Sequence, residues 1–181
     1  MSRLPIRPVP LAGLLALATG SALAADIRVP ADAPSIQAAI DQAQAGDRVL
    51  VDPGTWSGPV DFLGKDIVVE AVAGPDATVI DGGGSTGFVV RFASGESRAA
   101  TLRGFTVTGG FGQGGSNGAG PGGGIRIEGA APTLEGNVLA GNAGVLGGGL
   151  SVVDGAPRLV DNRFVGNQAL QGGGLYVQGG A

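Results

Sequence analysis

The residues of this 181-residue chain that could carry chemistry are few, because histidine and cysteine are both absent. Their absence excludes histidine-based catalytic triads, histidine metal sites, cysteine nucleophiles and disulfides. There remain 15 Asp and Glu, 11 Lys and Arg, and one tyrosine. On a polysaccharide, an unpaired Arg or Lys could act as the base of a β-elimination beside acidic residues that hold Ca²⁺, or two carboxylates could hydrolyse a glycosidic bond.

Six side chains are predicted to share one outward face of the fold: Glu70, Arg91, Arg126, Glu128, Ser151 and Tyr176. Glu70, Arg91 and Glu128 are expected in one row of alternating charge. Such a row is typical of a surface ion-pair ladder, in which each pair contributes less than ~1 kcal/mol. The alternative is a saccharide groove, in which Tyr176 stacks on a sugar and Arg126 binds an anionic group.

The same face gives no support for a catalytic residue. Glu128 aligns with Val153 and Glu135 with Val160 in the next copy of the repeat described below. No two acidic residues therefore stack on adjacent coils there, and the sequence predicts neither a metal site nor a cofactor. Acidic pairs in further coils would restore the enzyme interpretation, so it stays open.

A sequence repeat must position these side chains. Its copies begin with the Gly-Gly-Gly segments at Gly122, Gly147 and Gly172. A fixed period of this size is typical of a solenoid. In "GGGIRIEG" and its copies apolar residues alternate with other residues, which predicts short strands with one buried face, and no helical spacing occurs in the repeat. The expected fold is all-β, a right-handed parallel β-helix, whose hand follows the rule for parallel crossovers.

Asparagines recur within the repeat at two positions, giving the pairs Asn137 and Asn162, and Asn142 and Asn167. In a stacked β-helix equivalent residues lie ~4.8 Å apart, the spacing of neighbouring strands. We therefore expect the amides to form structural ladders that satisfy backbone groups at sharp corners.

Looser copies of the coil precede the repeat. "TLRGFTVTGG", which begins at Thr101, matches "TLEGNVLAGN", which begins at Thr133, and "RVLV", "IVVEA" and "FVVRF" are expected to be the first strands of three earlier coils. Stacking them gives about five to six coils over residues 48–181. Residues 25–47 are predicted to hold a short strand and a helix near 35–45, with Ser35 as N-cap and Gly46 as its end. Its apolar residues would close the N-terminal end of the core.

Residues 1–24 are predicted to be a secretory signal peptide. Arg3 and Arg7 precede the apolar run "LAGLLALA", and Ala22-Leu23-Ala24 fits an A-x-A cleavage site before Ala25. Cleavage would leave 9 basic and 15 acidic residues, a net charge of −6. We expect a secreted or cell-envelope protein, with no transmembrane segment and no binding of nucleic acid.

A family resemblance rests on these motifs. "IRVPADAPSIQAAIDQAQAGDRVLVDPGTW" resembles the opening of right-handed parallel β-helix proteins of the pectin-lyase-like superfamily: a V-P strand, a P-[ST]-I-Q-x-A-I helix and a G-D-x-V-x-V-x-P-G-T-[YW] first coil. The repeats resemble the G-G-[AG]-I and F-x-x-N units of bacterial surface β-helix proteins, including chlamydial polymorphic outer membrane proteins. The resemblance covers Asp26 to the end and implies the fold. The superfamily includes polysaccharide lyases, hydrolases, adhesins and non-catalytic repeats.

Two functions follow as expectations. The favoured one is an exported, non-catalytic β-helix that serves as a surface, adhesion or glycan-binding scaffold, with a polysaccharide or cell-surface glycan as partner. The alternative is a polysaccharide lyase or glycoside hydrolase whose active coils are partly or wholly missing from this chain. The last segment, "GGGLYVQGGA", ends on a strand, so we expect the solenoid to be truncated here, with its exposed coil continuing into further coils or packing on a partner.

Overall fold

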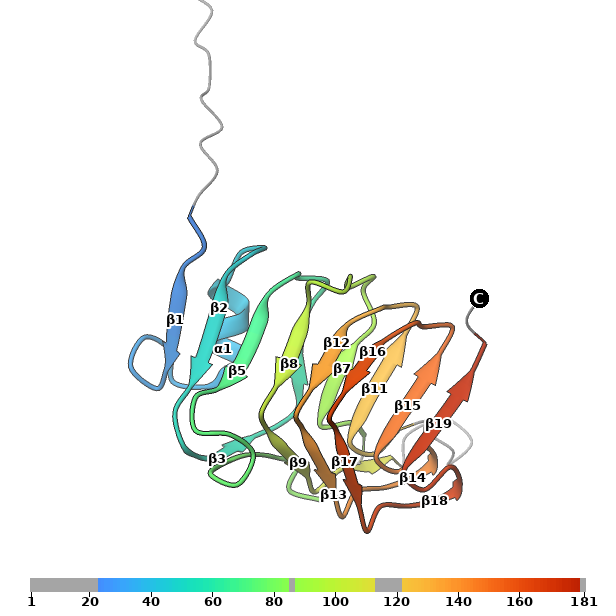
Figure 1. The fold of residues 1–181 in the computed structure, drawn as a ribbon. Coiled ribbons are helices and arrows are strands. Elements are labelled where there is room, and N and C mark those ends of the chain that lie inside the picture. The colour runs from blue at the N-terminus through green and yellow to red at the C-terminus, as the bar shows by residue number, and fades with distance from the viewer. Residues whose placement is uncertain (1–22, 85–86, 113–121, 180–181) are drawn as a thin grey trace, which may run out of the picture.

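The computed structural model of the protein describes residues 23–84, 87–112 and 122–179. Most of the predicted signal peptide and residues 113–121 of the glycine-rich segment lie outside the described residues. The described chain is all-β apart from one short helix, and its strands form stacked parallel sheets (Figure 1). This confirms the predicted class and is consistent with a parallel β-solenoid.

Four sheets make up the walls of the molecule. Sheet A contains, in spatial order, β1 (Asp26–Val29), β2 (Arg48–Val51), β5 (Val68–Ala71), β8 (Thr101–Arg103), β12 (Thr133–Glu135) and β16 (Arg158–Val160). Sheet B contains β3 (Gly54–Ser57), β6 (Thr78–Asp81), β9 (Thr106–Thr108), β13 (Val138–Ala140) and β17 (Arg163–Val165). Sheet C contains β4 (Val60–Asp61), β7 (Val90–Phe92), β11 (Ile125–Glu128), β15 (Leu150–Val153) and β19 (Leu175–Gln178). The smallest, sheet D, contains β10 (Phe111–Gly112), β14 (Ala143–Leu146) and β18 (Gln168–Gln171).

The register of the strands confirms the repeat. In sheet C, Ile125 pairs with Leu150, and Leu150 pairs with Leu175, each one period of the repeat further along the chain. In sheet A, Leu102 pairs with Leu134, as the match between the looser copy and the repeat predicts. Each circuit of the chain therefore places equivalent residues on neighbouring strands. Residues that repeat along the sequence consequently form rows across each sheet.

The core lies inside these walls and is built from the alternating apolar residues of each strand. Phe62 and Phe92 stack inside sheet C with their ring centroids 4.1 Å apart, and both are fully buried. Ile125 and Ile127 continue the same inward rows and are also fully buried. Burial of each such side chain stabilises the folded state by roughly 1.5–3 kcal/mol. The rows of inward-facing apolar residues therefore supply much of the stability.

One part of the predicted stacking is wrong. "RVLV" and "IVVEA" do pair with each other, as β2 and β5, but they lie in sheet A, whereas "FVVRF" contributes β7 to sheet C beside the Gly-Gly-Gly strands. Alternation with period 2 identifies a strand and its buried face, but it carries no information about which of several walls the strand joins. The sequence does not predict sheet D either, because residues 143–146 show no alternation of apolar and polar residues. In the structure all four of these residues are half-buried, so neither face of the strand is distinctly the buried one.

The single helix among the described residues, α1 (Ile36–Gln42), contacts β1, β2 and β4 at the N-terminal end (Figure 1). Ser35 is its N-cap, since the Ser35 hydroxyl accepts a hydrogen bond from the backbone N–H of Ala38. The helix ends earlier than expected, at Gln42 rather than near 45, because Ala43 turns to extended backbone while its N–H still bonds to Ala39. Its apolar face, including Ile36 and Ile40, is buried in the common core.

Candidate functional site

The outward face of sheet C carries one continuous row of polar residues. Strand register aligns Asp61 with Arg91, Arg91 with Arg126, Arg126 with Ser151, and Ser151 with Tyr176. Five parallel strands at ~4.8 Å spacing extend this row over ~19 Å. We call these five residues the sheet C row. It differs from the rows predicted from the sequence, which place Arg91 beside Glu128 and not beside Arg126.

Ion pairs occupy the first part of the sheet C row. Nη1 of Arg91 lies 3.0 Å from Oδ2 of Asp61, and the Arg91 guanidinium also lies over the ring of Phe88, 5.7 Å from its centroid. Arg126 pairs with Glu128, which follows it on the same strand. Each pair is partly exposed, so it contributes at most ~1 kcal/mol. Both arginines therefore keep part of their donor capacity at the surface.

Ser151 is placed differently from the expectation. It aligns with Arg126 and Tyr176, but its side chain is 0 % exposed, so Ser151 cannot meet a ligand on the surface as predicted. Gly122 lies close above it: a Cβ at Gly122 would come within 3.1 Å of the Ser151 Cβ. The Ser151 Oγ and the Arg126 Nε are both buried without a hydrogen-bond partner among the described residues. Buried polar groups are ordinarily paired with protein or with ordered water.

Tyr176 and Glu128 lie at the surface of sheet C. The Tyr176 hydroxyl donates a hydrogen bond of 3.2 Å to Gln178, and Gln178 belongs to the neighbouring row that begins at Glu128 and passes through Val153. This alignment of Glu128 with Val153 confirms the predicted register. Tyr176 thus stands at the end of the sheet C row, half-buried, with its hydroxyl at the surface.

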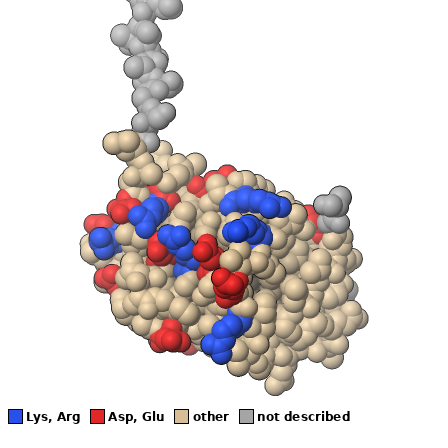
Figure 2. Space-filling view, viewed as in Figure 1, with Lys and Arg blue, Asp and Glu red and all other residues tan. Residues whose placement is uncertain are grey.

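Glu70 does not belong to this face. It lies on sheet A, where it aligns with Arg103, and its carboxylate accepts hydrogen bonds from Arg103 at 2.6 Å and from Arg48 at 2.9 Å. Burial raises the pKa of Glu70, but the hydrogen bonds and charges of the two arginines outweigh it and hold this pKa below its usual range. The predicted ladder of Glu70, Arg91 and Glu128 is therefore wrong. Figure 2 shows charged side chains gathered over the part of the face where β1, β2, β5 and β8 lie.

The four predicted structural asparagines form two ladders at the corners of the circuit. Nδ2 of Asn137 lies 3.1 Å from Oδ1 of Asn162, and the same Oδ1 accepts the backbone N–H of Asn137 at 3.0 Å. Asn142 and Asn167 repeat both contacts at the next corner. Each amide also donates to a carbonyl of the preceding circuit, Leu102 for Asn137 and Val107 for Asn142. The side-chain amides of the asparagines are therefore already hydrogen-bonded within the protein.

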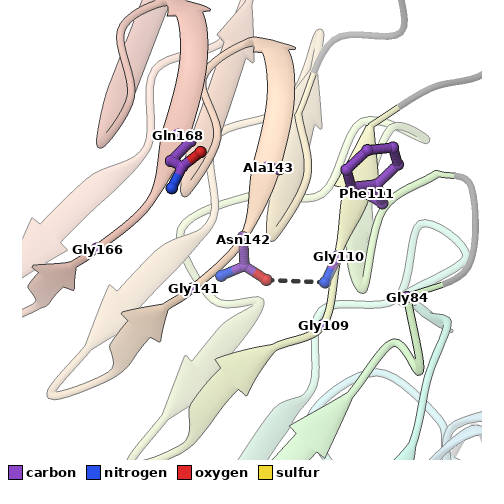
Figure 3. Close-up of a pocket in the computed structure, with 9 residues that line it drawn as sticks. All are labelled: Gly84, Gly109, Gly110, Phe111, Gly141, Asn142, Ala143, Gly166 and Gln168. Atoms are coloured by element: carbon purple, nitrogen blue, oxygen red, sulfur yellow. Dashed lines mark hydrogen bonds between the residues drawn. The ribbon is translucent and has the colours of Figure 1, made fainter.

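A shallow pocket of about 320 Å³ lies beside the second ladder (Figure 3). Its floor is made of corner glycines, of which Gly84 and Gly166 have open space where a Cβ would stand. The Phe111 ring and the Gln168 side chain stand at its sides. Asn142 offers it little, because its Oδ1 already accepts the N–H of Gly110 at 3.0 Å. The pocket could hold a flat group against the backbone, but it has few free polar groups to select one.

No group of three or more His, Cys, Asp or Glu residues close enough to hold a metal ion occurs in residues 23–84, 87–112 and 122–179. Within the same ranges no helix has the length and apolar character needed to cross a membrane.

Comparison with family models, with curated proteins and with solved structures finds no match for this chain. The fold and the site therefore define the protein by class alone. It is an all-β protein of stacked parallel sheets, with a repeated polar row on one outer wall.

The sequence analysis does not predict the positions of two residues that contribute to the structure, Asp61 and Lys65. Asp61 begins the sheet C row, and the signal for it was present, because the pattern of Val60-Asp61-Phe62 recurs as Val90-Arg91-Phe92 in the next circuit. Lys65 donates hydrogen bonds to three carbonyls at the end of α1, and no pattern in the sequence predicts these contacts.

Proposed function

We propose that this protein is an exported β-helix scaffold that binds an acidic glycan along the sheet C row and performs no catalysis there. The observation that carries the proposal is the alignment of Arg91, Arg126 and Tyr176 on one outer wall. A polymer with regularly spaced anionic groups suits a surface on which cationic side chains recur at the strand spacing. The aromatic ring at the end of the row adds a flat platform for a sugar.

The finer description of the fold belongs to the same proposal. We take the solenoid to be right-handed, as parallel crossovers almost always are, and related to the pectin-lyase-like superfamily. Its coils would be five: β2–β4, β5–β7, β8–β11, β12–β15 and β16–β19. The motifs of residues 26–56 support this assignment, together with the strand order of the sheets.

Two buried polar atoms on this wall lack a hydrogen-bond partner among the described residues, as do Thr78 Oγ1 on sheet B and Arg103 Nε on sheet A. The Arg126 Nε and the Ser151 Oγ belong to register partners, and neither has a partner of its own among the described residues. A small shift of the Arg126 side chain, which is 27 % exposed, would turn its donors toward an anionic ligand. The buried serine beneath it is then a positioning residue and makes no direct contact.

The alternative, a polysaccharide lyase or hydrolase, has weaker support on this wall. Asp61 and Glu128, its two carboxylates, are each paired with an arginine. A glycosidase needs two carboxylates that face the same bond, and a lyase needs a free basic group. Neither arrangement occurs in the sheet C row.

Substitution of the two partly exposed anchors, Tyr176 and Arg126, tests the proposal. Tyr176→Ala and Arg126→Ala should each weaken binding to an acidic polysaccharide such as polygalacturonate by about three- to tenfold, the loss expected for one stacking or ionic contact. Arg158→Ala, which removes an exposed cation from sheet A, serves as the matched control and should change nothing. Affinity electrophoresis gives the binding, and the thermal transition reports whether each variant is folded. Unchanged retention of both anchor variants would show that the sheet C row does not bind the polysaccharide.

A further inference from the structure

The start of the folded chain is held by one carboxylate. The backbone nitrogen of Ala25 donates a hydrogen bond of 2.8 Å to Oδ1 of Asp47. The carbonyl of Ala25 in turn accepts the N–H of Arg48 at 2.8 Å, and from Asp26 onward β1 pairs with β2. Ala25 is thus bound through both of its backbone groups to two consecutive residues.

Asp47 is fixed in place for this contact. Its other oxygen, Oδ2, accepts the N–H of Gln44 at 2.7 Å, and the residue is only 8 % exposed. The hydrogen bonds from the backbone of Ala25 and Gln44 lower the pKa of Asp47, against the opposing effect of burial. The carboxylate is therefore ionised at neutral pH. Among the described residues, the hydrogen bonds to this carboxylate come from backbone amides, so a full positive charge in place of one amide would give a stronger, charge-assisted bond.

The predicted cleavage site lies immediately before this contact. Leu23 is 93 % exposed, and Ala24 and Ala25 are exposed as well. The bond between Ala24 and Ala25 is therefore accessible to a peptidase while β1 beyond it is already paired. Hydrolysis adds water across this bond, leaving a carboxylate on Ala24 and an amine on Ala25. That amine takes up a proton at neutral pH, because its ordinary pKa is about 7.7–8.0.

We propose that Asp47 is a binding site for the α-ammonium group that cleavage after Ala24 creates at Ala25. The nitrogen that now donates one amide hydrogen bond becomes a cation with three donors at the same position, 2.8 Å from an ionised carboxylate. Removal of the leader thereby converts a neutral hydrogen bond into an ion pair that closes the N-terminal end of sheet A. The inference rests on the export that forms part of the proposed function.

The sign of the pH dependence follows from the charges around this nitrogen. Asp47 accepts its hydrogen bond, the carboxylate of Asp26 lies on the neighbouring residue, and the Arg48 guanidinium lies 3.5 Å from Asp26 and also pairs with Glu70. The ionised Asp47 should raise the pKa of the α-amine in the folded protein. Its contribution to stability is then complete below about pH 7.7, the unfolded value, and is lost as the pH rises through the raised folded value.

The experiment begins with the full chain, expressed with its leader and purified after export. Mass spectrometry of the exported protein identifies its N-terminus, which should be Ala25. Trace acetylation at a series of pH values then gives the pKa of the α-amine, with Lys65, the only lysine, as an internal reference. We expect a value about one unit or more above that of the Asp47→Asn variant. Asp26→Asn is the matched control, because it removes a nearby carboxylate that does not accept from Ala25.

A second variant protects the result if Asp47→Asn does not fold. A glycine inserted between Ala24 and Ala25 moves the ammonium one residue away from Asp47, so the pKa of the amine should return to about 7.7–8.0 and the loss of thermal stability above pH 8 should disappear. An N-terminus other than Ala25, or equal amine pKa values in all these proteins, would overturn the inference. Polysaccharide retention, measured on the same preparations, fails or succeeds independently of both outcomes.

Discussion

At the scale of single residues, the asparagine ladders are directional. Each asparagine Oδ1 accepts a backbone N–H of the circuit before it, and each Nδ2 donates backward to a carbonyl. Asn137, which is fully buried, takes part in contacts on both sides: its Oδ1 accepts the N–H of Phe105 at 3.1 Å, and its own N–H donates to Asn162. Asn162 has its side-chain donor and acceptor directed to the preceding circuit only. The two rungs should therefore differ in energetic weight.

Asn137→Ala should lower the free energy of unfolding by about 2 kcal/mol, because it leaves the buried N–H of Phe105 and carbonyl of Leu102 without their side-chain partner and removes the bond from Nδ2 to Asn162. Asn162→Ala should cost about 1 kcal/mol, since that side chain is only partly buried and bonds in one direction. Denaturant titration of both variants at constant slope measures the difference. Equal midpoints for the two variants, or none shifted from the parent, would contradict the directional ladder.

At the scale of elements, α1 is held at both ends by side chains. Ser35 caps its first turn, and the Nζ of Lys65 donates to the carbonyls of Ile40, Asp41 and Ala43 at 2.7–2.9 Å. An ammonium group at this position satisfies carbonyls that the end of the helix leaves free and also complements the helix dipole. So short a helix has little stability of its own, and these contacts and its buried face keep it over the core.

Lys65→Met should therefore destabilise the protein by about 1–2 kcal/mol, through loss of charge-assisted hydrogen bonds to three carbonyls. Lys65→Arg is the control that keeps the charge and part of the bonding. Hydrogen exchange of the α1 amides should accelerate in the methionine variant more than exchange in sheet C. If exchange rises uniformly or not at all, Lys65 is no helix cap.

At the scale of the whole molecule, apolar exposure increases toward the last strands. The inward row of sheet C is fully buried from Val60 to Leu150, but Leu175 is 39 % exposed and Val177 is 57 % exposed. Leu159 and Phe164 show the same change in sheets A and B. This end of the molecule also carries few charges in Figure 2. Apolar side chains combined with unpaired strand edges favour association.

The 181-residue chain should accordingly self-associate as its concentration rises. Phe164→Ser, which removes an apolar ring from that end, should lower the associated fraction, as measured by sedimentation velocity. Leu63→Ser is the matched control, because Leu63 is 48 % exposed but lies in the first circuit, after β4. If the protein stays monomeric at high concentration, or if both substitutions change the associated fraction equally, association through the last strands would be contradicted.

The sequence alone was sufficient for the class of fold, the repeat register and the capped helix. A fixed period and strict alternation leave few other structures, because identical strands bury their apolar faces only when stacked on one another. Ser35 was predictable because helix capping is local, and the pairing of Ile125 with Leu150 followed from the period.

Only the tertiary structure decided which wall each early strand joins, and with it the composition of the site. Glu70 and Arg91 sit on strands with the same local pattern, yet one lies on sheet A with Arg48 and Arg103 and the other on sheet C with Asp61. Ser151 likewise lies against Gly122 of the preceding circuit, where a Cβ at Gly122 would come within 3.1 Å of the Ser151 Cβ. Alternation fixes which face of a strand is buried, but the corners between strands set the direction of the next wall, and their geometry is not encoded in the period.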